Sequence, residues 1–155
     1  MSTKTRTGTE MTNETRLEPW QAGLVGGIVG GAVFGAMLTM MMTPVIEMAI
    51  PALYGIAGPA GLAGWVIHMA NSAVLGVVFG ALVGASALSD TGKLAGAGLA
   101  YGVVLWVVLA AIVMPVWLSA VGFPMSPPLP NFNPMSLVGH AVYGVVLGIV
   151  YAAFR

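Results

Sequence analysis

The sequence predicts an all-α integral membrane protein, a four-helix bundle built from two parallel two-helix hairpin repeats. Hydrophobic residues make up 58% of the 155 residues and charged residues only 6%, whereas about 25% of the residues in a soluble domain are charged. Four long apolar segments follow one another after a polar N-terminal stretch. The second half of the chain also repeats the pattern of the first. Together these features favour a bundle that spans a lipid bilayer.

The N-terminal stretch, residues 1–18, is rich in threonine and charge and has almost no apolar pattern. Such a segment cannot bury enough apolar surface to offset the entropy lost on ordering. We therefore expect a disordered cytoplasmic tail, followed by a single bundle over residues 19–155.

The four apolar segments cover residues 20–43, 61–86, 94–118 and 136–154. Each is close to the roughly 20 residues that a helix needs to cross the hydrocarbon core. Residues 44–60 contain three prolines and residues 119–135 contain five. Because proline breaks the helical hydrogen-bond ladder, we do not expect a continuous helix in either segment. Both remain largely apolar, which predicts loops that lie at the membrane surface.

The basic residues all fall on one side of this four-span arrangement. The loops on the opposite side contain no lysine or arginine, and basic residues are retained on the cytoplasmic side of membranes. The pattern predicts a multi-pass protein of the cytoplasmic (plasma) membrane with both termini in the cytoplasm. The residues concerned are Lys4, Arg6, Arg16, Lys93 and Arg155.

The repeat is clearest in spans two and four, where "GWVIHMANSAVLGVVFGA" aligns with "SLVGHAVYGVVLGIVYAA" and His68 with His140. Repeat one covers residues 20–86 and repeat two residues 94–154. Both histidines lie on stripes of small residues spaced four apart, the small-xxx-small pattern along which membrane helices pack closely. We therefore expect both imidazoles to face the bundle interior, at the same depth of roughly 7 to 10 Å.

The two histidines are the candidate binding residues. Glycine is densest in the cytoplasmic half and bulky side chains gather in the outer half, which predicts a bundle that is splayed outward. On diagonal helices ~12 to 14 Å apart, His68 and His140 can hold a cofactor between them. The leading interpretation is a cytochrome b-like protein in which they ligate haem b, for electron transfer or for redox or haem sensing. Asn71, Ser72 and Tyr143 are near enough in sequence to tune the site.

Other interpretations of these residues remain open. Glu47 is the only carboxylate predicted on the outer side, and with His68 and His140 it can form a zinc, iron or copper site. It is equally consistent with a surface carboxylate. The histidines can also serve a proton relay, or form interhelical hydrogen bonds with no cofactor, as intramembrane polar groups often do.

Three function classes follow from these interpretations. Beside the haem-binding protein stand a non-catalytic structural or accessory subunit of a larger membrane complex, and a small transporter with its path on the pseudo-symmetry axis. Unused small-residue stripes would allow a homodimer. No basic patch indicates nucleic acid, and no nucleophile triad or phosphate-binding loop indicates an enzyme. The sequence contains no cysteine, so disulfide and thiolate metal sites are excluded.

Overall fold

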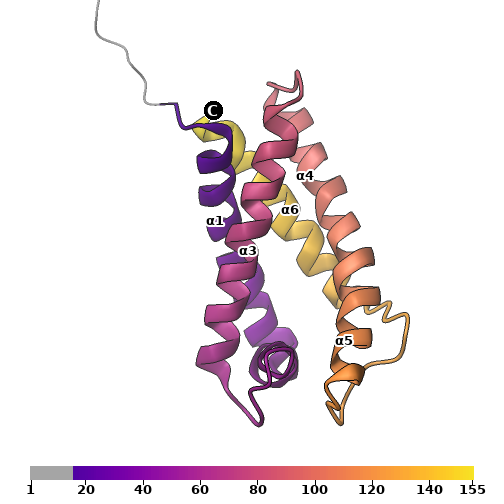
Figure 1. The fold of residues 1–155 in the computed structure, drawn as a ribbon. Helices are drawn as coiled ribbons and strands as arrows, with labels where there is room; N and C mark the ends of the chain where they lie inside the picture. Colours follow the sequence, from indigo (N-terminus) through magenta and orange to yellow (C-terminus); the bar gives the residue numbers. More distant parts are fainter. Residues whose placement is uncertain (1–15) are drawn as a thin grey trace, which may run out of the picture.

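The computed structural model describes residues 16–155, so all but the last three residues of the tail predicted to be disordered, residues 1–18, lie outside this part. The described chain is helical and contains no strand. Three spans are single helices: α1 (Pro19–Met41), α3 (Gly61–Gly84) and α6 (Pro134–Phe154). The other span is one helical rod in three parts, α4 (Thr91–Leu105), the π-helix η2 (Trp106–Val113) and α5 (Met114–Ala120) (Figure 1).

All four spans are long and apolar enough to cross a membrane, which fits a multi-pass membrane protein. The third and fourth begin three and two residues earlier than predicted, because polar residues cap them. The Asp90 carboxylate accepts a hydrogen bond from the backbone nitrogen of Lys93, 3.0 Å away. The Asn133 side chain accepts one from the backbone nitrogen of Ser136 at 3.1 Å. These side chains satisfy donors at a helix start that have no partner within the helix.

Glycines bring the helices together in two antiparallel pairs, α1 with α3 and α4 with α6. A Cβ atom added to Gly76 would lie 2.6 Å from the Cα atom of Gly27, and one added to Gly98 would lie 2.9 Å from the carbonyl carbon of Gly144. The two pairs are joined along α1 and α6, whereas α3 and α4 make few contacts. The internal repeat itself remains a prediction.

The bundle has two different ends. We call the end with residues 42–60 and 121–133 the proline-rich end, and the end with Leu17 and Phe154 the terminal end. The Leu17 nitrogen donates to the Phe154 carbonyl at 2.9 Å. Further along the bundle, the Tyr101 hydroxyl on α4 donates to the Leu75 carbonyl on α3 at 2.9 Å. Beyond this bond α3 and α5 diverge toward the proline-rich end (Figure 1).

Two prolines tie the loops of the proline-rich end to the helices. Because proline has no N–H, it leaves the carbonyl four residues earlier without its helical partner. Pro51 frees the Glu47 carbonyl, which accepts from the Ala60 nitrogen at 2.8 Å. Pro115 frees the Ala111 carbonyl, which accepts from the Asn131 nitrogen at 2.9 Å. The returning loops therefore satisfy both carbonyls.

Helical structure extends further into the proline-rich segments than the sequence suggested. The first segment contains the π-helix η1 (Val45–Ala49) and the short helix α2 (Ile50–Ala52). The third span runs through Pro115 to Ala120. Proline is tolerated at these places because the helix changes hydrogen-bond period and the loops supply the missing donors.

Candidate functional site

A cavity of about 570 Å³ opens between the two helix pairs at the proline-rich end. Its lining is mostly aliphatic and aromatic, and among residues 16–155 no lysine, arginine, aspartate or glutamate contributes to it. Both histidines predicted from the sequence line it. The other polar side chains of the lining are those of Tyr54, Asn71, Ser72, Asn131, Asn133, Ser136 and Tyr143.

His68 lies against the backbone of α1. Its side chain is only 7% exposed, and its Nε2 atom is 2.9 Å from the Gly31 carbonyl oxygen. The approach requires glycine on α1, because a Cβ atom at Gly35 would lie 3.1 Å from the imidazole Cδ2 atom. Since a carbonyl oxygen can only accept, Nε2 carries the hydrogen. The Nδ1 atom of neutral His68 therefore keeps an unused lone pair.

His140 is half-buried and forms its bond within its own helix. Its Nδ1 atom donates to the Ser136 carbonyl oxygen at 2.7 Å, which leaves a lone pair on Nε2. His68 and His140 lie seven and six residues beyond the first residues of α3 and α6, so both are ~10 Å from the helix starts. Their depths match, but their hydrogen bonds do not.

Phe34 of α1 contacts both imidazole rings and was not identified from the sequence. Its ring centroid lies 5.4 Å from that of His68 and 4.8 Å from that of His140, in edge-to-face geometry. These distances limit the separation of the imidazole centroids to about 10 Å at most. Phe34 reaches α6 at Gly139, where a Cβ atom would lie 2.8 Å from Cζ of the phenyl ring. The sequence signal that could have identified Phe34 is that it is a single aromatic residue within a glycine-rich run.

The structure brings the predicted tuning residues into the same cavity. Asn71, Ser72 and Tyr143 all line it. The buried Tyr143 hydroxyl donates to the Ser72 carbonyl at 2.8 Å, which links α6 to α3 below the histidines. This phenol is therefore occupied within the protein.

Glu47 does not line the cavity. It lies in η1 beside the start of α3, where its Oε1 atom would be 3.7 Å from a Cβ atom added to Gly61. Within residues 16–155 no group of three or more histidine, cysteine or acidic side chains is placed to hold a metal ion. The structure thus pairs His68 with His140 and leaves Glu47 apart.

The mouth of the cavity is bridged by two aromatic residues. Tyr54 follows α2 and Trp117 belongs to α5, and their ring centroids are 6.1 Å apart. The Tyr54 hydroxyl also donates to the Asn71 side-chain oxygen at 3.4 Å. Tyr54 and Trp117, one residue beside each helix pair, therefore meet across the cavity.

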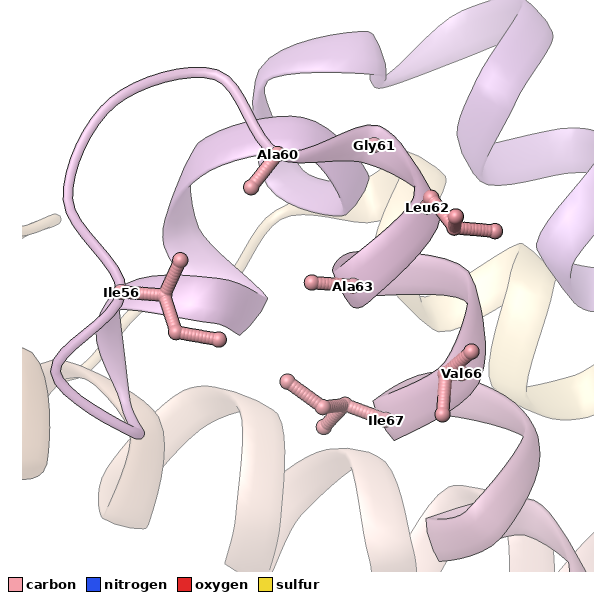
Figure 2. Close-up of a pocket in the computed structure, with 7 residues that line it drawn as sticks. All are labelled: Ile56, Ala60, Gly61, Leu62, Ala63, Val66 and Ile67. Carbon is pink, nitrogen blue, oxygen red and sulfur yellow. The ribbon is translucent and has the colours of Figure 1, made fainter.

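A second hollow of about 650 Å³ lies on the outside of the molecule, beside the start of α3. Figure 2 shows that its side chains come from the loop before α3 and from the first turns of α3, and that they are apolar. It contains no side-chain hydrogen-bonding group that could select a ligand. The cavity between the helix pairs is therefore the candidate site.

Comparisons with known proteins identify a family without a described activity. The model of a family described as a family of unknown function, DUF6789, matches residues 17–155. No curated protein and no solved structure matches the chain.

Proposed function

This chain belongs to the DUF6789 family, and we propose that it binds a lipophilic ligand within the membrane, in the cavity between its two helix pairs. The observation that carries this proposal is that His68 and His140, from different helices, line one cavity of about 570 Å³. Small-molecule sites typically have this size and combine an apolar lining with a few polar groups. Placing an ionisable side chain such as histidine inside the membrane costs free energy, and residues of this kind usually have a function.

We place the proline-rich end on the outer side of the plasma membrane. The start of α4 beside Asp90, residues 16–18 and Arg155 share the opposite end with all described basic residues, which agrees with basic residues remaining in the cytoplasm. The ligand would then lie in the outer leaflet, where it exchanges with the exterior or with the lipid around the bundle.

Haem b is the specific ligand predicted from the sequence, and one feature supports it. In each histidine one ring nitrogen is held by a backbone carbonyl and the other keeps its lone pair, as is usual for metal-ligating histidines. Bound haem would supply electron transfer or redox sensing. Both imidazoles contact Phe34, so axial ligation by both requires this ring to move.

Filling the cavity tests the proposal. Ala110 lies in η2 and lines the cavity, whereas Ala100 is an exposed residue of the same span. Ala110→Phe should block the site and Ala100→Phe should leave it open. The ligand is measured by mass spectrometry of organic extracts of the purified proteins. A compound other than the bulk membrane phospholipids, present in wild type and Ala100→Phe but absent from Ala110→Phe, is expected, and identical extracts from all three would contradict the proposal.

An absorption spectrum tests haem. If haem b is the ligand, protein from haem-replete cells shows a Soret band that His68→Phe and His140→Phe each abolish. A colourless protein that also fails to take up added haemin would exclude haem b. The broader proposal of a lipophilic ligand would then be tested by the extraction experiment alone.

A further inference from the structure

We propose that the ligand of this cavity is a quinol, a neutral hydroquinone with an apolar tail, whose two hydroxyl groups donate hydrogen bonds to His68 and His140. This inference rests on the proposed function and names the ligand class of the same site.

The hydrogen-bonding state of the two imidazoles indicates a donor ligand. His68 uses its Nε2 hydrogen on the Gly31 carbonyl, and His140 uses its Nδ1 hydrogen on the Ser136 carbonyl. Each neutral ring therefore keeps one nitrogen that can accept a hydrogen bond and has no further N–H to donate. The two tyrosine hydroxyls in the lining already donate, Tyr143 to the Ser72 carbonyl and Tyr54 to the Asn71 side chain. The two histidines are thus complementary to hydroxyl groups.

The uncharged lining that residues 16–155 provide indicates a neutral ligand. Within these residues no lysine, arginine, aspartate or glutamate lines the cavity, and an ionised ligand without a countercharge is strongly disfavoured in a low-dielectric site. A neutral hydroquinone meets this condition. A ligand with free carboxylate or phosphate groups does not.

The geometry favours one rigid ring over a flexible diol. The imidazole centroids are at most about 10 Å apart and at similar depth, so a ring with hydroxyls at opposite ends can reach both. A flexible diol would lose rotamer entropy on bridging them. Phe34 contacts both imidazoles, so a ring that bridges them displaces the phenyl ring, which can then pack against the bound ring.

The loose side of the bundle provides room for the tail. α3 and α4 make few contacts, and aliphatic residues of α3 and η2, among them Val74, Leu109 and Val113, line the cavity on this side. A tail leaving between α3 and η2 would enter the surrounding lipid. The ligand would then reach its site laterally from the bilayer.

The test compares the two redox forms of one molecule, a decyl-substituted benzoquinol and the corresponding benzoquinone, on the whole protein in lipid nanodiscs. The quinone has the same shape but no hydroxyl donors. Its carbonyl oxygens would face the imidazole lone pairs, and two acceptors cannot form a hydrogen bond. Affinity is obtained from the ligand-dependent rise in melting temperature. We expect the quinol to bind at least about tenfold more tightly than the quinone.

The variants are His140→Phe and, as control, Phe154→Leu at an exposed position. His140 bonds only to its own helix, so its replacement should preserve the fold. His140→Phe should weaken quinol binding about three- to tenfold and change quinone binding little, and Phe154→Leu should change neither. If His140→Phe fails to fold, His140→Leu, which also removes the acceptor, should weaken quinol binding in the same way.

Other outcomes separate this inference from the proposed function. Equal binding of quinol and quinone, or quinol binding unchanged in His140→Phe, would overturn the ligand class. Haem binding that quinol cannot displace would overturn it as well and would leave the lipophilic-ligand site intact. If quinol and quinone both fail to bind and the extracts of wild type and Ala110→Phe are identical, both proposals fall.

Discussion

At the scale of single residues, Phe34 determines how the two histidines meet. The sequence places His68 and His140 at one depth, but the phenyl ring contacts both imidazoles and is itself only 7% exposed. In the predicted repeat, with Pro44 aligned to Pro115, the position that corresponds to Phe34 is Leu105, which also lines the cavity. The two halves of the chain therefore contribute unequal side chains around the histidines.

Replacing this ring should destabilise the protein. We expect Phe34→Ala to lower the free energy of unfolding by about 3 kcal/mol, because it removes packing contacts and leaves a void beside both histidines. Phe154→Ala, at a position that is 45% exposed, should change it little. Unfolding by denaturing detergent measures both values. An equal effect of the two substitutions would show that Phe34 does not support the site.

At the scale of helices, close packing of backbone against backbone stabilises the two helix pairs, α1 with α3 and α4 with α6. Neighbouring glycines of α4 differ sharply in their surroundings. A Cβ atom at Gly98 would lie 2.9 Å from the carbonyl carbon of Gly144, whereas one at Gly96 would meet nothing within 4 Å. The interface is built from backbone contacts, so its stability depends on the absence of side chains.

Gly98→Ala and Gly96→Ala form a matched test of this interface. We expect Gly98→Ala to cost about 1 to 3 kcal/mol, because α4 and α6 must separate. Gly96→Ala should be neutral or slightly stabilising, since alanine is the better helix former. Melting temperatures in one detergent measure the difference. Comparable losses from both substitutions would mean that close packing at Gly98 is unimportant.

The stability that the loop at residues 121–133 contributes should depend on a backbone N–H group rather than on a side chain. Asn131→Pro removes the N–H that satisfies the Ala111 carbonyl, whereas Asn131→Ala retains it. We expect the proline variant to lose about 1 to 3 kcal/mol of stability and the alanine variant to lose much less. Guanidinium or detergent unfolding distinguishes them, and equal stability would show that water replaces the loop donor at no cost.

At the scale of the whole molecule, the bundle is closed at one end and open at the other. Aromatic packing of Phe79 with Tyr101 and Tyr151, at centroid distances of 5.4 and 5.6 Å, fills the space between the pairs toward the terminal end. The cavity occupies the proline-rich end. The orientation of the bundle in the membrane decides on which side the cavity lies.

The orientation can be measured by cysteine labelling, because the natural sequence contains no cysteine. Ser119→Cys lies at the proline-rich end and Ser89→Cys between α3 and α4, and both positions are exposed. We expect a membrane-impermeant maleimide to label Ser119→Cys in intact cells and Ser89→Cys only after permeabilisation. The reverse pattern would place the cavity on the cytoplasmic side.

The sequence by itself determined the membrane class, the four spans to within a few residues, and the two histidines as interior candidates. These properties follow from composition and from the spacing of residues along a helix, which are local. Boundaries were displaced at Asp90 and Asn133, whose capping bonds extend the helices beyond the apolar runs.

Only the tertiary structure decided what surrounds the histidines. The contact of Phe34 with both rings, the Gly31 carbonyl bound by His68 and the separation of Glu47 from the pair each depend on which helices pack closely and at what register. No spacing along one helix contains that information. The hydrogen bond between Asn131 and Ala111 also depends on the tertiary structure. A proline in the sequence predicts a carbonyl without a helical partner but does not indicate which loop will supply the donor.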